Sequence, residues 1–188
     1  LLKEFHPTLV YMQSDEITLV WDVPTSELSQ YPFDGKRHKI ESVIPSYACS
    51  VFTRKQIELL PEKKIDISID ARAFNVPTEL EAYNAILWRQ LDASKNYISS
   101  LAQTLFSSRQ LNKLSTRDRA KLILDTTGKD VDTIDERLGL FFFRGEELHN
   151  PQQGELFDDY KSLPVMRSKT FVKHINLLKL RKDANFKL

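Results

Sequence analysis

Cysteine, glycine and long apolar runs are all scarce in this chain of 188 residues. Its one cysteine, Cys49, cannot form an internal disulfide, so we expect a reducing, cytoplasmic compartment. The longest apolar run apart from glycine, Leu138 to Phe143, is far shorter than the ~20 residues of a membrane span. No charged-then-apolar leader opens the chain, so we expect no secretory signal. The chain has only five glycines, which argues against low-complexity and glycine-loop architectures. Its length suits one domain with an ordinary core.

Three common kinds of active site are disfavoured by the sequence. Gly128-Lys129 resembles the end of a phosphate loop, but Ile123 stands where the first glycine belongs. Zinc is not expected, because the four histidines are scattered and only one cysteine could assist them. The sequence nominates no partner for a nucleophilic Cys49, which lies near an apolar helix stripe and is expected to be an inert packed thiol.

Positive charge is concentrated at the C-terminal end. Residues 161–188 contain six lysines and two arginines against one acid, a net charge of +7, although the whole chain carries +1. Such asymmetry is typical of a surface apposed to nucleic acid or phosphate, and a solvated tail is the alternative. We therefore expect two parts, a catalytic domain with a helical extension over residues 1–160 and a basic segment over residues 161–188.

The first 21 residues predict a β-hairpin. Two β-rich runs, Leu9 to Met12 and Ile17 to Trp21, flank the polar stretch Gln13-Ser14-Asp15-Glu16. Two acids therefore lie at or near the turn.

The rest of the chain predicts helices with one further strand. Apolar residues recur at helical spacing up to Val51, and Pro45 indicates that the regular helix starts only just before it. Alternation over Ile65 to Arg72 predicts a half-buried strand, and Thr78 with Glu81 forms a capping box that opens a long helix. Further along, the sequence predicts a short helix from Ser115 or Thr116 to Leu124, and a buried strand or turn over Leu140 to Phe143. The order of these elements predicts an α+β fold.

The paired acids at the hairpin are the most informative chemical feature. Asp15 alone could be only a turn former, but Asp15 and Glu16 together could hold magnesium, which prefers carboxylates and substrate phosphates. A complete site needs another acid from a neighbouring strand, while Lys36, Arg37 and Lys39 could neutralise a triphosphate. These residues favour a metal-dependent nucleotidyltransferase.

Four blocks follow one another along the chain: Tyr11-Met12-Gln13-Ser14-Asp15-Glu16, then Lys36 to Lys39 with Ser42, then Ile69-Asp70-Ala71-Arg72, then Trp88-Arg89-Gln90-Leu91-Asp92. In order and spacing they resemble the blocks of the tRNA-His guanylyltransferase family, and the similarity extends from about Phe5 to Gly145. The similarity is closer to the bacterial, archaeal and phage-type guanylyltransferase-like proteins, which repair tRNA 5′ ends by adding nucleotides in the 3′-to-5′ direction.

The resemblance implies a polymerase-palm-like antiparallel sheet, two Mg²⁺ ions, ATP and GTP as nucleotides, tRNA as partner, and a homotetramer. It makes Asp15 a metal ligand, and it makes both Asp15 and Glu16 catalytic residues. It places Ser14, Lys36, Arg37, Lys39 and Asn96 at the nucleotide. The family's first strand, with an Asp-Gly-Arg element that supplies another metal carboxylate, is expected before Leu1.

Two departures from the family pattern bear on the substrate. Ser94 occupies the position of a family histidine, which favours template-directed repair over recognition of the tRNA-His anticodon. Met12 replaces a glycine that is common before the Gln-Ser-Asp-Glu block. We expect RNA to bind Arg89, Lys95, Lys179, Arg181 and Lys182. A palm-type nucleotide cyclase and a non-catalytic RNA-binding module remain open as alternatives.

Overall fold

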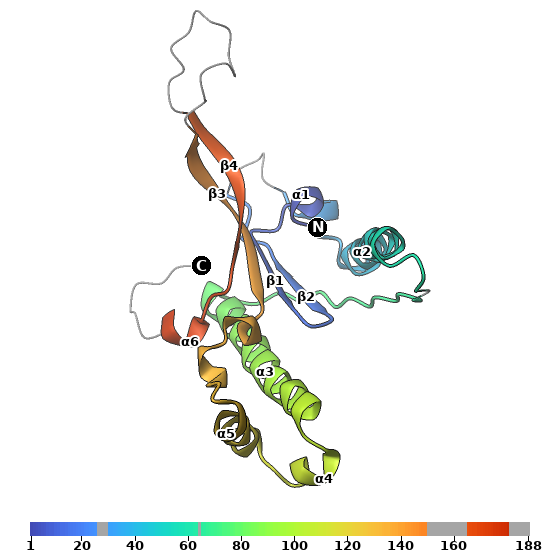
Figure 1. Cartoon of the computed structure of the whole chain (residues 1–188). Coiled ribbons are helices and arrows are strands. Elements are labelled where there is room, and N and C mark those ends of the chain that lie inside the picture. The colour runs from blue at the N-terminus through green and yellow to red at the C-terminus, as the bar shows by residue number, and fades with distance from the viewer. Residues whose placement is uncertain (26–29, 64, 150–164, 181–188) are drawn as a thin grey trace, which may run out of the picture.

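The fold is known from a computed structural model, which describes residues 1–25, 30–63, 65–149 and 165–180. A four-stranded sheet lies beside one long helix. Further helices lie on one side of the sheet and near the far end of that long helix (Figure 1). The elements in chain order are α1 (Leu2–Phe5), β1 (Leu9–Gln13), β2 (Glu16–Val20), η1 (Pro32–Gly35), α2 (Arg37–Leu59), α3 (Glu79–Leu105), α4 (Ser108–Leu111), α5 (Thr116–Thr127), η2 (Val131–Thr133), η3 (Asp135–Leu138), β3 (Leu140–His149), β4 (Val165–Lys173) and α6 (Leu177–Leu180).

The sheet is antiparallel throughout, in the order β2-β1-β3-β4. β1 pairs with β3 only from Leu9 opposite Phe143 to Met12 opposite Leu140. Beyond that register β3 pairs with β4 alone, so the β3–β4 hairpin projects from the body of the molecule (Figure 1). The α+β fold and the hairpin over residues 9–21 are confirmed.

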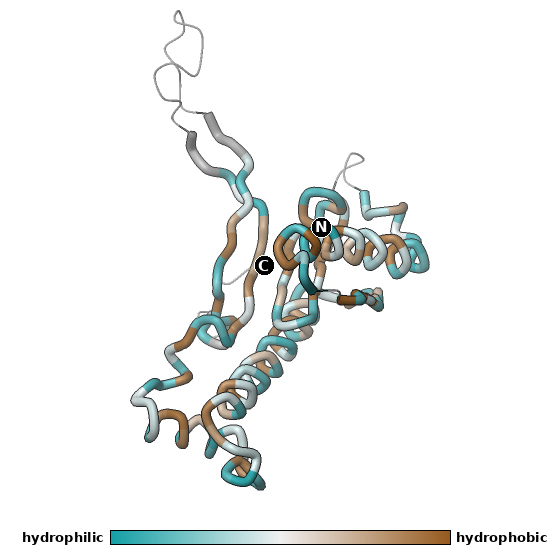
Figure 2. The backbone as a smooth tube through the Cα atoms, turned by 45° about the vertical axis from the view of Figure 1, so that its right-hand side comes forward, coloured by the Kyte–Doolittle hydropathy of each residue, from teal (hydrophilic) through white to brown (hydrophobic). Residues whose placement is uncertain are grey.

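The main core forms where α3 packs against the sheet. Its buried members are Tyr11, Tyr83, Ile86, Leu87, Phe141 and Leu177. The Tyr11 hydroxyl donates a hydrogen bond to the Leu138 carbonyl at 3.1 Å, and burial raises the pKa of Tyr11, which keeps the phenol a donor. Apolar positions recur along α3, as helical packing on a sheet requires (Figure 2).

A buried amide on α3 fixes the end of the described chain. Gln90 is 2% exposed, and its amide nitrogen donates to the carbonyls of Leu138 and Ile175 at 3.0 and 2.8 Å. Its amide oxygen accepts from the Leu177 N–H at 3.0 Å. All three contacts are to main-chain groups, so Gln90 ties α6 to α3 and to the turn before β3.

A second core covers the far half of α3. Ile98 and Ala102 of α3 pack with Leu111, Ile123 and Val131, which come from α4, α5 and η2. Both predicted caps are confirmed: Thr78 accepts from the Glu81 N–H at 3.2 Å, and Ser115 accepts from the Asp118 N–H at 3.2 Å. Since α5 continues to Thr127, it extends beyond the predicted end at Leu124.

Two sequence-based predictions are wrong. Residues 65–72 form no strand: alternation gives Ile67 and Ile69 a half-buried face, but no strand among the described residues pairs with them. α2 begins at Arg37 rather than just before Pro45, so the helix accommodates a buried proline in its interior. Pro45 removes one helical donor, and the rest of a 23-residue helix outweighs that loss.

Part of the basic C-terminal segment belongs to the sheet. Residues 165–173 form β4, and Leu177 of α6 is buried in the main core. None of the helices in the described part of the chain is long and apolar enough to cross a membrane.

Candidate nucleotide-binding site

The turn between β1 and β2 presents Asp15 to solvent. Gln13 and Glu16 are paired across the hairpin, so Ser14 and Asp15 alone form the turn, and Ser14 takes a left-handed φ of 47°. Both turn residues are exposed. Asp15 makes no hydrogen bond or ion pair within the described part of the chain, so its carboxylate can accept a ligand.

Glu16, next to Asp15, is engaged within the protein instead. Its two carboxylate oxygens accept hydrogen bonds from Arg89, one from Nε at 2.6 Å and one from Nη2. Gln13 donates a further hydrogen bond to Glu16 at 3.2 Å, and the hydrogen bond to Glu16 raises the pKa of Arg89. Arg89, which the sequence placed at RNA, is therefore bound to the hairpin in this structure.

One face of α3 continues from the hairpin. Asp92 and Asn96 lie three and seven residues after Arg89, which puts all three on one side of the helix within roughly 10 Å along its axis. Asn96 and Lys95 are both exposed. Of the residues predicted at the nucleotide, Asn96 thus shares a helix face with the residue that binds Glu16.

The predicted basic residues gather at the start of α2. Lys36 is the N-cap, Arg37 begins the helix, and Lys39 lies in the first turn, all exposed. Lys36 pairs with Asp34 at 3.3 Å and Arg37 with Glu41 at 2.9 Å, whereas Lys39 has no ion pair among the described residues. Because a helix N-terminus is itself positive, these cations suit an anion such as a triphosphate.

The start of α2 is also tied to the chain that precedes α3. Glu41 accepts a hydrogen bond from the Ala73 N–H at 2.9 Å, and this bond, followed by that from Arg37, holds the pKa of Glu41 below its usual range. The pairing keeps Glu41 ionised and fixes Arg37 against it.

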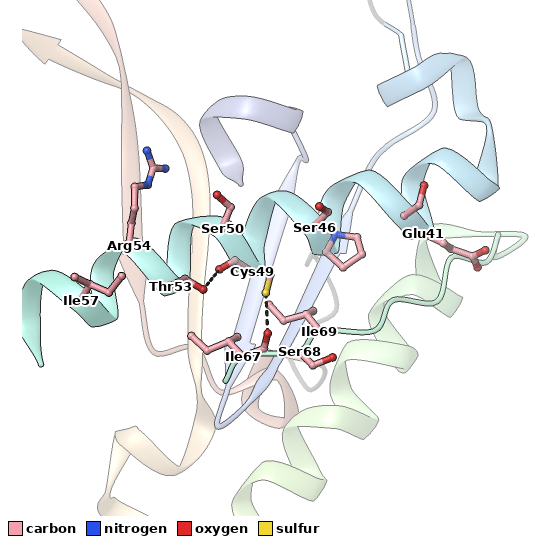
Figure 3. Close-up of a pocket in the computed structure, with 12 residues that line it drawn as sticks. Glu41, Ser46, Cys49, Ser50, Thr53, Arg54, Ile57, Ile67, Ser68 and Ile69 are labelled. Carbon is pink, nitrogen blue, oxygen red and sulfur yellow. Dashed lines mark hydrogen bonds between the residues drawn. The ribbon is translucent and has the colours of Figure 1, made fainter. Parts of the chain in front are cut away.

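A cavity of about 610 Å³ lies between α2 and residues 67–69 (Figure 3). Cys49 points into it and donates a hydrogen bond from Sγ to the Ile67 carbonyl at 2.9 Å. Apart from Glu41 and Arg54, its lining is uncharged, with several serines and isoleucines. The cavity therefore offers little that would hold a phosphate or a metal ion.

Sequence reasoning missed a basic and aromatic surface on the β3–β4 hairpin. Phe143 and Phe171 stack at 5.7 Å, and Lys173 lies over both rings at 5.8 Å. Lys169 lies over Phe171 at 5.9 Å. Alternating lysine and aromatic residues from Lys169 to Lys173 were the signal in the sequence. Of the three C-terminal cations predicted at RNA, Lys179 is exposed on α6, while Arg181 and Lys182 lie outside the described residues.

A magnesium ion fits this site in part. No group of three or more His, Cys, Asp or Glu residues that could hold a metal occurs in the described ranges. Asp15 is an exposed carboxylate, and Glu16 is committed to Arg89. One such oxygen donor suits an ion that keeps waters and takes its other ligands from phosphates.

Comparison with known proteins finds a family model that matches the N-terminal part of the chain. A sequence model described as tRNAHis guanylyltransferase matches residues 1–77, the part that bears both the hairpin acids and the basic start of α2. No curated protein matches the chain in sequence.

Two of the solved structures that share the fold are described as follows. One is a bacterial tRNA(His) guanylyltransferase (Thg1)-like protein in complex with ATP, with 32% identity and a TM-score of 0.67, over 73% of this chain and 60% of that one. The other is a bacterial protein of the same description in complex with GTP, with 25% identity and a TM-score of 0.67, over 97% of this chain and 69% of that one. This chain thus spans less than two thirds of the first of these relatives. Together, the family match over residues 1–77 and the shared palm-like α+β fold support the tRNAHis guanylyltransferase-like family for this chain.

Proposed function

We propose that this protein is a nucleotidyltransferase that adds nucleotides to the 5′ end of tRNA, in the 3′-to-5′ direction and against a template. The main support is that the family match falls on residues 1–77, which carry an exposed Asp15 at a hairpin turn and three cations at a helix N-terminus. ATP or GTP would transfer its nucleoside monophosphate to the 5′-phosphate of the RNA and release pyrophosphate. The 3′-hydroxyl of an incoming nucleotide would then lose its proton, attack that 5′-phosphate and release the nucleoside monophosphate.

Each group has a role in this chemistry. Lys36, Lys39 and the N-terminus of α2 bind the triphosphate by charge, while Ser14 and Asn96 add hydrogen bonds to it. Asp15 would hold magnesium, and two such ions would supply charge stabilisation for the attacking and leaving oxygens. A further carboxylate from a neighbouring strand would complete that site.

The choice of repair over tRNA-His specificity rests on one position. Ser94, which stands where the family has a histidine, accepts a hydrogen bond from Nη1 of Arg137 at 2.6 Å. Its hydroxyl is thereby engaged within the protein, so we propose that this position does not read an anticodon. We also propose a homotetramer in the cytoplasm.

The first prediction concerns Lys39. Replacing it with alanine should raise the apparent KM for the activating nucleotide about tenfold and leave the KM for RNA nearly unchanged, because one charged contact to a phosphate is lost. Steady-state kinetics with either substrate varied would measure this. Lys55→Ala, at the far end of α2, is the matched control. An unchanged KM for the nucleotide would contradict the prediction and show that Lys39 is only a solvated surface residue.

The second prediction concerns the basic C-terminal segment. Replacing Lys179, Arg181 and Lys182 together with alanine should weaken tRNA binding and flatten its salt dependence by roughly one unit of slope per lost phosphate contact. Turnover at saturating RNA should change much less. Binding titrations at several salt concentrations would measure both effects, and parallel slopes with equal affinity would contradict the prediction.

Two other functions make different predictions for one assay. A nucleotide cyclase would convert triphosphate without RNA, and an RNA-binding module would bind tRNA without extending it. Incubation with 5′-truncated tRNA, ATP, GTP and magnesium separates both from the proposed activity.

A further inference from the structure

The contact between Arg89 and Glu16 joins two elements that are far apart in the chain. The residues are 73 positions apart, one in the middle of α3 and the other at the first position of β2. Two nitrogens of the guanidinium face the two oxygens of the carboxylate, the fork arrangement that fixes both distance and direction. A single-point contact would fix the distance between the two side chains but not their relative orientation.

Arg89 is itself held from two further sides. Its guanidinium lies 5.4 Å from the centre of the Trp88 ring and 3.7 Å from a carboxylate oxygen of Asp92. The Arg89 side chain is 28% exposed and that of Glu16 34%, so the pair is only partly in water. An arginine fixed on a rigid helix can thus hold a hairpin end in place.

Only one residue separates this contact from the exposed ligand. Asp15 immediately precedes Glu16, and the turn consists of Ser14 and Asp15 alone. Gln13 binds the same carboxylate from the other strand, so both strands meet at Glu16. The Asp15 carboxylate is therefore one residue away from the Arg89–Glu16 contact.

We propose that Arg89 and Glu16 are positioning residues that hold the hairpin turn against α3 and so aim Asp15, and that Glu16 is not a metal ligand. This inference rests on the proposed function and refines it. It assigns Arg89 to the hairpin instead of RNA, and it separates the two neighbouring acids by role.

Kinetics of single and double variants test the proposal. Arg89→Gln and Glu16→Gln should each lower the rate of nucleotide addition at saturating substrates by about 10- to 100-fold, because small misplacement of a reacting group is costly. The double variant should be no slower than either single variant, since one contact is lost in all three. The magnesium concentration for half-maximal rate should change by the same factor in all three variants, since each of them displaces the same ligand, Asp15. Arg109→Gln, which removes an equal charge from α4, is the control and should keep the parental rate.

Arg89→Lys distinguishes geometry from charge. A lysine keeps the charge but cannot form the two-point contact, so it should recover only part of the rate. Full recovery would overturn the positioning role. Glu16→Gln would also overturn the proposal if it alone raised the magnesium requirement, since that result would make Glu16 a ligand.

Hydrogen exchange supplies a readout that needs no activity. In Arg89→Gln the hairpin amides of β1 and β2 should exchange at least tenfold faster than in the parent and in Arg109→Gln, while the α5 amides are unchanged. Equal exchange rates of the hairpin amides in all three proteins would show that the hairpin is stable without the Arg89–Glu16 contact, and would overturn the inference. A parent without nucleotide addition would instead overturn the proposed function, while the exchange data still report the contact.

Discussion

Replacing Asp15 with asparagine should lower nucleotide addition by more than about 1,000-fold, because a lost magnesium carboxylate removes several kcal/mol of transition-state stabilisation. Asparagine keeps the size of the side chain and suits a turn. Asp15 is exposed and makes no hydrogen bond or ion pair within the described part of the chain, so the free energy of unfolding should change by less than about 0.5 kcal/mol. Single-turnover kinetics and urea unfolding would measure the two quantities.

The control for Asp15→Asn is Asp125→Asn, which removes an exposed carboxylate from α5. It should keep the parental rate. A well-folded Asp15→Asn protein with near-parental activity would contradict the assignment of the hairpin acid to the metal.

The largest effect on stability is expected at Gly139, between η3 and β3. Its φ of 72° and ψ of −173° lie in a region that is essentially reserved for glycine. A Cβ there would lie 2.7 Å from the Met12 carbonyl oxygen and 2.8 Å from the Tyr11 ring. Neither neighbour can move easily, since Met12 contributes backbone of β1 and Tyr11 is 1% exposed in the main core. Gly139→Ala should therefore lower the free energy of unfolding by about 3 to 5 kcal/mol.

Gly128→Ala separates the steric effect from the conformational one. Gly128 also has a positive φ, 69°, but it ends α5 in open space with no atom near a new Cβ. Gly128→Ala should therefore lower the free energy of unfolding by only about 1 kcal/mol. Urea denaturation of both variants measures the two changes in the free energy of unfolding. Equal decreases would contradict the close packing of β1 against Gly139.

Local signals in the sequence account for the elements that were predicted correctly. The β1–β2 hairpin follows from two β-rich runs around a polar turn, and α3 and α5 begin at residues whose side chains cap them. Each of these rules needs only neighbours a few positions apart.

Features that depend on distant partners were not predictable in the same way. Residues 65–72 alternate as a strand does, yet a strand also needs a neighbouring strand, which no alternation reveals. The contact of Arg89 with Glu16 has no local signal either, since the two residues are 73 positions apart. The basic segment after residue 160 was interpreted by its charge, and that interpretation passed over the β-favouring run Thr170-Phe171-Val172 within the strand β4.

The most direct test of the central proposal uses a tRNA that lacks its first 5′ nucleotide and carries a labelled 5′-monophosphate. The chain is incubated with it, ATP, each of the four nucleoside triphosphates in turn, and magnesium, and the product length is measured. We expect a product one nucleotide longer at the 5′ end, made only with the nucleotide complementary to the opposite template base, and a changed preference when that base is changed. Failure to extend the RNA, or addition that ignores the template base, would contradict the account.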